Sequence, residues 1–157
     1  VSLSNFSSAV SLSYMAFPNA SKKNRPTLKV GDLVYSRVSA AEKELESEIE
    51  CMDPTTGQDS GFGLLDGGVV LDINLAYARN LTFNQKFPLL ELLSKFTQFE
   101  VAIGLNGKLW LKCEEFKHTL ACYRSITDCE KRPISEYKSI IKTHFKNIVD
   151  TTEEDDE

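Results

Sequence analysis

A short basic stretch near the start of the chain carries the clearest potential for chemistry. Lys22, Lys23 and Arg25 are clustered around Asn24, in a segment (residues 15–28) rich in Asn, Ser and Pro. Cations gathered on a loop can bind phosphate groups, and amide side chains can add hydrogen bonds. Neighbouring side chains could stack on a base or add a further hydrogen bond: Tyr14, Phe17 and Asn19. From the residues alone, an RNA-binding loop and a solubilising surface loop both fit this pattern.

A second motif, Gly-Leu-Asn-Gly at residues 104–107, joins two apolar runs. Asn-Gly between such runs predicts a tight β-hairpin with positive φ at Asn106 and Gly107. In the second arm leucines alternate with Lys and Trp, which places Trp110 on the more polar face. An ordinary hairpin is one interpretation and a ligand-binding loop is another. Our hypothesis is that Gly104, Asn106, Gly107 and Trp110 form a structural motif that docks against the first half of the chain.

The other reactive side chains do not form a recognisable catalytic or metal site. The four cysteines lack Cys-x-x-Cys spacing, which argues against a zinc ribbon and favours reduced thiols: Cys51, Cys113, Cys122 and Cys129. His118 and His144 are interpreted as structural or exposed. Glutamates alternate over residues 42–50 as on a solvated strand edge, and glycines 61–68 lack a phosphate-cradle pattern. We expect no catalytic residue, no metal, no cofactor and no enzymatic activity.

Composition describes a globular protein whose charge is uneven. The chain has 157 residues and a net charge of -5. The end of the chain, residues 150–157, carries six of the acidic residues and is expected to be a disordered tail. No apolar run is long enough to span a membrane, so a membrane partner is not expected. Because the first residue is Val, we expect the chain to be a fragment. Only three or four strands are convincing before Asp53, fewer than a five-stranded barrel needs, so N-terminal strands are expected to be missing.

The elements that must position these residues change in character along the chain. Residues 1–53 read as short strands, at about 1–6, 9–14, 33–38 and 48–52, which favours a small barrel or sandwich. The Gly-rich residues 54–68 are predicted to be a linker between two domains.

Residues 69–149 show mixed strand and helix patterns. A strand is predicted at 69–73, helices at 75–81 and 89–96, the hairpin at 99–112, and helices at 114–130 and from Pro133 onward. Asn74 is the expected N-cap of the first helix. The expected buried face of the 114–130 helix consists of Phe116, Leu120, Tyr123 and Thr127. The expected stripe on the last helix consists of Ile134, Tyr137, Ile141, Phe145 and Ile148. Strand–helix–helix–strand–strand–helix is the order of a K-homology (KH) domain, an RNA-binding module.

Four stretches carry a resemblance to a known family: YMAFPNASKKNRPTLKVGDLVYSRV, AEKELESEIEC, FEVAIGLNGKLWLKCEE and HTLACYR. Together they resemble the ribosomal-RNA-processing protein forty (exosome component three) family of eukaryotic RNA exosome cap subunits. The resemblance implies an α+β multidomain fold: a partial S1-type OB β-barrel, then a KH-like α/β domain with an extra C-terminal helix.

The resemblance also implies a role and a setting. Family members are non-catalytic subunits that stabilise a ring of RNase PH-like proteins and guide RNA into its central channel. Expected partners are the ring subunits, other cap subunits, RNA and, indirectly, 3′–5′ exonucleases that process rRNA and degrade RNA. Expected locations are nucleus, nucleolus and cytoplasm. The alternative is an autonomous single-stranded RNA-binding regulator. The resemblance favours RNA binding by Lys22, Lys23, Asn24 and Arg25.

One departure from an RNA-clamping KH module is visible in the sequence. Such a module places Gly-x-x-Gly between its first two helices, so that phosphates can approach backbone amides. Here that connection, residues 82–87, reads TFNQKF and has no glycine. We therefore expect the KH-like domain to be structural.

Overall fold

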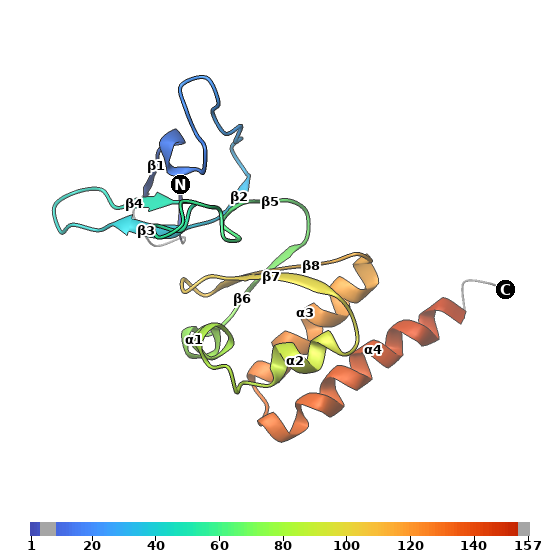
Figure 1. Cartoon of the computed structure of the whole chain (residues 1–157). Coiled ribbons are helices and arrows are strands. Elements are labelled where there is room, and N and C mark those ends of the chain that lie inside the picture. The colour runs from blue at the N-terminus through green and yellow to red at the C-terminus, as the bar shows by residue number, and fades with distance from the viewer. Residues whose placement is uncertain (4–8, 154–157) are drawn as a thin grey trace. The chain divides into compact units, whose positions relative to one another are not determined.

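The change from strand to helix periodicity near residue 68 coincides with a division of the structure into two units. The computed structural model describes residues 1–3 and 9–153, and its units are Val1–Asp66 and Gly67–Glu157. Figure 1 shows short strands and long loops in the first unit and a helix-covered sheet in the second. No helix in the described part of the chain is long and apolar enough to cross a bilayer.

The first unit contains five short strands in two sheets. One sheet has the order β1-β4-β3 and the other pairs β2 with β5. The elements are β1 (Ser11–Leu12), the 3-10 helix η1 (Tyr14–Ala16), β2 (Leu33–Tyr35), β3 (Arg37–Ala40), β4 (Glu48–Glu50) and β5 (Gly63–Leu65). The strand predicted at 33–38 is thus two strands that pair with different partners. Of the strand predicted at 1–6, residues 4–6 lie outside the described residues.

The segment predicted to be a linker, residues 54–68, contains a strand of the first unit. Asp53 starts a closed turn, because its carbonyl accepts from Gly57 N (2.8 Å) and its N–H donates to Gln58 O (2.8 Å). The chain then returns as β5, whose Leu65 and Gly63 pair antiparallel with residues of β2. The turn at residues 53–57 reverses the chain so that β5 can pair with β2, and the first unit therefore extends to Asp66.

The second unit has the predicted element order. Its elements are β6 (Val69–Asp72), α1 (Leu75–Phe83), α2 (Leu89–Ser94), β7 (Phe99–Ile103), β8 (Lys108–Cys113), α3 (Phe116–Glu130), η2 (Ile134–Glu136) and α4 (Tyr137–Glu153). The strands form an antiparallel sheet in the order β6-β8-β7. Figure 1 shows the helices on one face of this sheet. Asn74 caps α1 as predicted, because its Oδ1 accepts from Ala76 N (2.8 Å).

The core of the second unit lies between the sheet and the helices. Leu109 and Leu111 of β8 and Leu89 and Leu93 of α2 are fully buried within it. The predicted stripe on α4 is confirmed at Tyr137, Ile141 and Phe145, which are buried, and at Ile148, which packs against the core. Ile134 is exposed instead, because it lies in η2 before α4 begins.

The buried face predicted for α3 is wrong in part. Tyr123 is half-buried and packs against the core, and Thr127 is half-buried. Phe116 and Leu120 are exposed, whereas Cys122, Ile126 and Cys129 are fully buried. The sequence offers two apolar stripes on this helix. The face toward the core is rich in small residues, with Ala121, Cys122, Ser125 and Cys129 buried beside Ile126. Small side chains permit neighbouring elements to approach closely, and the larger Phe116 is left outside.

The acidic end of the chain differs in part from the expectation of disorder. The last helix, α4, continues through Thr151 and Thr152 to Glu153. The rest of the predicted tail, residues 154–157, lies outside the described residues.

Candidate nucleic-acid interface

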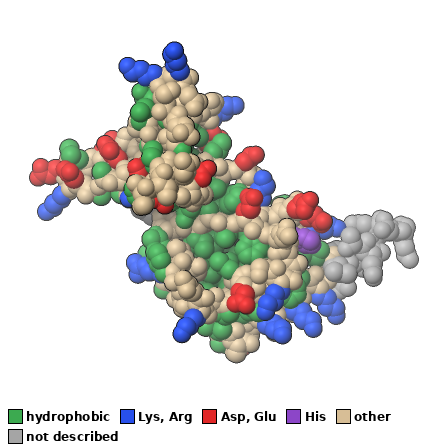
Figure 2. All heavy atoms as spheres, viewed as in Figure 1, with side chains coloured by type: hydrophobic (Ala, Val, Ile, Leu, Met, Phe, Trp, Pro, Cys, Tyr) green, Lys and Arg blue, Asp and Glu red, His purple; other side chains and the backbone are tan. Residues whose placement is uncertain are grey.

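The basic loop is held in a defined turn, so the backbone positions that carry its charged side chains are fixed. Ser21 N donates to Asn24 O (3.0 Å), and Asn24 N donates back to Ser21 O (3.2 Å) and to Ser21 Oγ (3.0 Å). Lys22 and Lys23 are the two central residues of this turn and both are exposed. Figure 2 shows Lys and Arg side chains projecting at the end of this segment. The turn therefore presents two ammonium groups side by side to solvent.

Arg25 is positioned by an aromatic ring. Its guanidinium carbon lies 4.6 Å from the centroid of the Tyr14 ring, the geometry of a cation–π contact. Tyr14 begins η1, where the Ser13 side chain accepts from Met15 N (3.2 Å). Stacking restrains the guanidinium while its N–H donors stay at the edge of the plane. Tyr14, considered above as a base-stacking residue, has one ring face covered by Arg25.

Asn24 braces the loop. Its Nδ2 donates to the carbonyl of Asn19 (3.2 Å), which draws the two ends of the turn segment together. Asn19 has a φ of 57°, a left-handed conformation that asparagine tolerates better than most residues. The Asn24 amide therefore already has a structural partner, and its Oδ1 is the atom left for a ligand.

The charge of the loop is not compensated within the described residues. The ion pair of the first unit joins Arg37 of β3 to Glu50 of β4, away from the loop in sequence. Neither Lys22, Lys23 nor Arg25 has an acidic partner within 4.0 Å among the residues that the structure describes. Such cations can neutralise an external anion without first breaking a salt bridge.

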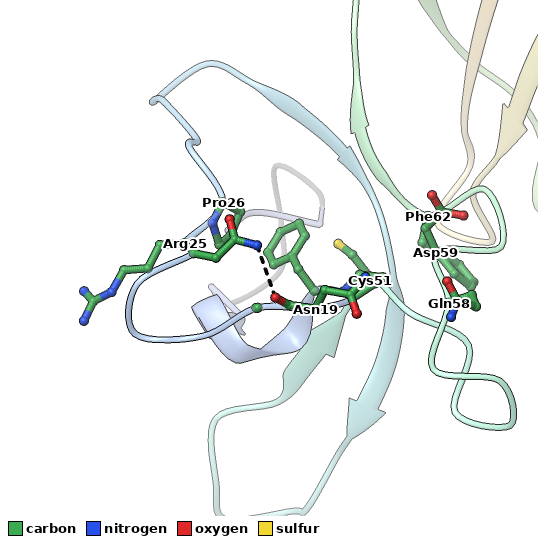
Figure 3. A pocket seen from close by; sticks show the side chains of 11 residues that line it. Asn19, Arg25, Pro26, Cys51, Gln58, Asp59 and Phe62 are labelled. Atoms are coloured by element: carbon green, nitrogen blue, oxygen red, sulfur yellow. Dashed lines mark hydrogen bonds between the residues drawn. The ribbon is translucent and has the colours of Figure 1, made fainter.

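A pocket of about 420 Å³ lies beside the basic loop. Figure 3 shows Asn19 and Arg25 on one side of it, Cys51 behind, and Gln58, Asp59 and Phe62 on the other side. The residues that line it are Phe17, Pro18, Asn19, Ala20, Asn24, Arg25, Pro26, Cys51, Gln58, Asp59 and Phe62. Burial raises the pKa of the Cys51 thiol to about 11, so this wall is neutral at physiological pH.

Sequence reasoning missed the far wall of this pocket. Phe62 is half-buried and stacks on Tyr35 of β2, with ring centroids 5.2 Å apart. Gln58, Asp59 and Phe62 fall in the stretch interpreted as a linker. The turn signal at Asp53 could have indicated that the chain returns to the first unit.

The Gly-Leu-Asn-Gly hairpin forms, but its turn differs from the prediction. Only Gly107 has positive φ (84°), and Asn106 does not. Gly107 N donates to Gly104 O (3.2 Å), and Asn106 Oδ1 accepts from Lys108 N (3.3 Å). This is a longer turn that ends in one left-handed glycine, rather than a two-residue primed turn. The asparagine side chain closes the turn, so its backbone need not be left-handed.

The hairpin turn is packed inside its own unit. The Gly107 carbonyl accepts from Ile73 N (2.8 Å), at the end of β6. A Cβ added at Gly107 would lie 3.0 Å from the Ile73 carbonyl oxygen, and one at Gly104 only 2.2 Å from Asn106 Oδ1. Gly107 is therefore constrained by its positive φ and by nearby backbone, whereas a side chain at Gly104 would first have to displace the Asn106 side chain. The predicted docking of this motif against the first half of the chain stays a prediction.

Trp110 is buried and has a polar partner. Its Nε1 donates to the carbonyl of Gly67 (2.8 Å), where the second unit begins. A Cβ at Gly68 would lie 2.8 Å from the same indole nitrogen, so the ring packs directly over this backbone. The indole thus fixes the entry of the chain into β6.

Most backbone amides of the connection between α1 and α2 already have hydrogen-bond partners. Lys86 N donates to Asn84 Oδ1 (3.1 Å), and Phe87 N donates to Asn84 O (3.0 Å). Asn84 N is itself bonded to Asn80 O (3.1 Å). The sequence lacks the glycines of an RNA clamp, and the structure adds that three backbone donors here already have partners.

Within the described residues, no group of three or more His, Cys, Asp or Glu side chains could hold a metal ion. The four cysteines are free and buried, and the Cys113 and Cys122 sulfurs lie 3.8 Å apart. Burial raises the pKa of Cys129 to about 12 and raises that of Cys122 as well. These thiols are therefore core side chains rather than nucleophiles.

Two family models match the chain, one in each unit. Residues 1–63 match the S1 domain of exosome complex component RRP40, and residues 68–117 match the KH domain. The predicted fold class, an S1 domain followed by a KH-like domain, is thereby confirmed.

Relatives named RRP40 occur in fungi and animals. The chain is 64% identical to exosome complex component RRP40 of Saccharomyces cerevisiae, over 98% of this chain and 65% of the relative. It is 38% identical to rrp40 of Schizosaccharomyces pombe, over 83% of this chain and 56% of that protein. For RRP40 of Homo sapiens the identity is 31%, over 85% of this chain and 48% of the relative. The chain thus spans between about half and two thirds of these relatives' length.

A solved structure agrees at the level of the fold. It is described as an exosome complex RNA-binding protein and superposes with a TM-score of 0.62 at 21% sequence identity. The match covers 80% of this chain and 68% of the other chain.

Proposed function

This chain belongs to the exosome complex component RRP40 family, and we propose from that premise that it is a non-catalytic, RNA-binding cap subunit of the RNA exosome. In this role it stabilises the RNase PH-like ring and guides RNA into the central channel, for rRNA processing and RNA degradation. Its partners are the ring subunits, the other cap subunits and RNA, with 3′–5′ exonucleases acting downstream. It works in nucleus, nucleolus and cytoplasm.

The observation that carries the RNA-guiding part is the uncompensated charge of the basic loop. Lys22, Lys23 and Arg25 lie on a segment that is braced by hydrogen bonds and by the Tyr14 ring. A braced loop loses little conformational entropy when it binds, so its cations are prepared for a phosphate chain. Three such cations without acidic partners in the described structure support a backbone-directed, sequence-tolerant grip on single-stranded RNA.

The KH-like unit supports the structural part of the proposal. Its α1–α2 connection lacks the glycines of a clamp, and three of its backbone donors are occupied by Asn84 and Asn80. Its hairpin turn and Trp110 are tightly packed instead. We propose that Gly104, Asn106, Gly107 and Trp110 brace the two domains as one scaffold. An S1 and a KH domain are RNA-binding domains, so RNA hydrolysis is assigned to other subunits.

Charge reversal in the loop tests the RNA-guiding role. The triple variant Lys22→Glu, Lys23→Glu and Arg25→Glu should weaken binding of a labelled single-stranded RNA by at least about 10-fold in fluorescence anisotropy. The slope of log affinity against log salt should become shallower by about two, because three phosphate contacts are lost. Because all three side chains are exposed, the substitutions should leave the thermal unfolding temperature of the protein unchanged.

A matched control makes the same charge change elsewhere. Lys43, Arg79 and Lys142 are exposed and lie far from the loop in sequence. Their reversal to Glu should leave RNA affinity within about twofold of the parent. Equal losses in both triple variants would mean that net charge, and not the loop, governs binding.

Co-purification tests the assembly role. The tagged protein, expressed in a cell that carries its relatives' complex, should recover RNase PH-like ring subunits in equal stoichiometry. Recovery of the protein with RNA but without any ring subunit would favour the autonomous regulator.

A further inference from the structure

The pocket beside the basic loop has two chemically different sides. Arg25 and Asn24 line one side, next to the uncompensated cations at Lys22 and Lys23. Gln58 and Asp59 line the other, together with the ring of Phe62 (Figure 3). A chain of phosphates is attracted to the first side and repelled from the second by the Asp59 carboxylate. The two sides therefore fit different parts of one nucleotide.

The Asp59 side has acceptors and an apolar surface. Asp59 is exposed, and within the described part of the chain its carboxylate has neither a hydrogen-bond nor an ion-pair partner. Phe62 is half-buried and held against Tyr35 at 5.2 Å, so it is a fixed apolar wall. Phe17 adds a second half-buried ring to the pocket lining. Free acceptors beside aromatic rings suit a nucleobase, which needs stacking and edge-on hydrogen bonds.

We propose that this pocket takes one base of the bound RNA and prefers guanine, while the adjoining backbone lies along Lys22, Lys23 and Arg25. The inference rests on the proposed RNA-binding function and adds a base preference to it. The pocket volume of about 420 Å³ lies within the range of roughly 300–1,000 Å³ that is usual for small-molecule sites.

Guanine is favoured because a carboxylate only accepts hydrogen bonds. Guanine presents two adjacent donors, N1–H and the N2 amino group, which match the two oxygens of Asp59. Adenine and cytosine place a ring-nitrogen acceptor beside their amino group, and uracil flanks its single N–H with two carbonyl oxygens. Each of these would set an acceptor against the Asp59 carboxylate. One bidentate contact of this kind gives discrimination on the order of 10-fold.

The test compares two labelled oligouridines that differ in one central base, guanine or adenine. The whole chain should bind the guanine oligonucleotide about 10-fold more tightly in fluorescence anisotropy. Asp59→Asn should reduce the difference between the two oligonucleotides to less than about twofold, because an amide also donates and no longer selects for two donors. The side chain is exposed, so unchanged thermal unfolding is expected and is measured in parallel.

The control is Glu44→Gln, which removes one negative charge from an exposed position of the same unit, outside the pocket. It should keep the guanine preference. Equal binding of both oligonucleotides by the parent protein would overturn the base preference and leave the loop-based function standing. Loss of preference in both Asp59→Asn and Glu44→Gln would overturn it too, as an effect of charge alone. Binding of neither oligonucleotide would overturn the proposed function and this inference together.

Discussion

Arg25 illustrates how a single contact can prepare a binding residue. A free arginine side chain loses rotamer entropy of about 2 kcal/mol when it is immobilised by a ligand. In the unbound protein the Arg25 guanidinium carbon already lies 4.6 Å from the centroid of the Tyr14 ring. Part of this entropy is therefore lost before a ligand binds. Lys22 and Lys23 have no comparable support among the described residues, so they remain mobile point charges at the centre of a rigid turn. The loop combines one oriented donor with two adaptable ones.

Gly107 is the residue of the hairpin that tolerates change least. Its φ of 84° is strained for any side chain, and a Cβ would press on the Ile73 carbonyl at 3.0 Å. Gly107→Val should lower the free energy of unfolding by about 1–3 kcal/mol, which is measurable by urea denaturation.

Leu105 supplies the control for Gly107 within the same turn. Its φ is not positive and its side chain is 54% exposed. Leu105→Val should therefore change the unfolding free energy by less than about 0.5 kcal/mol. A Gly107→Val variant as stable as the parent would show that neither the left-handed backbone nor the contact with Ile73 constrains this turn.

Helix α3 has two apolar stripes, and its packing chooses between them. The stripe with Cys122, Ile126 and Cys129 is buried, and the stripe with Phe116 and Leu120 is exposed. The α3–α4 contact is reinforced at the surface by the His144 and Asp128 side chains (2.5 Å). The element therefore contributes stability through its smaller side chains.

This choice of face predicts losses of stability of different size for two similar truncations on α3. Ile126→Ala removes fully buried methyl groups and should cost about 2–5 kcal/mol of unfolding free energy. Leu120→Ala, at a position 37% exposed, should cost clearly less, about 1 kcal/mol. Both are measured by urea denaturation with unchanged slopes. The reverse order of effects would mean that the helix is rotated relative to the structure described above.

At the scale of the whole molecule, burial is divided unequally between the two units. Among the described residues, only Val10, Ile49 and Cys51 are buried apolar side chains of the first unit. The large hydrophobic core cluster belongs entirely to the second unit, from Leu71 to Phe145. Because stability follows buried apolar area, the second unit should be the more stable of the two.

Limited proteolysis should reveal this difference. Trypsin should cleave within Val1–Asp66 first, and a fragment that begins at Glu44, after the cut at Lys43, and contains the whole second unit should persist, identified by mass spectrometry. Added single-stranded RNA should slow cleavage after Lys22 and Lys23 if it covers the basic loop. Early loss of the second unit, with the first unit intact, would contradict the stability order.

Much of the architecture followed from the sequence because it depends on local physics. Asn74 caps α1, the 99–113 segment forms a hairpin, and the order of elements in the second unit is as predicted. Capping, turn chemistry and periodicity act over a few residues, so one sequence displays them. The basic loop was visible for the same reason, because its charges are contiguous in the chain.

What only the tertiary structure decided involves residues that are distant in sequence. The buried face of α3 depended on how closely α4 and the sheet approach it. The pocket brings Asn19 and Arg25 together with Asp59 and Phe62. This is possible because β5, which follows Phe62, pairs with β2. The hairpin turn is held from outside by the hydrogen bond that Ile73 N donates to the Gly107 carbonyl, between residues 34 positions apart. Periodicity lists the candidates for such contacts, but selecting among them requires the packing energy of the folded chain.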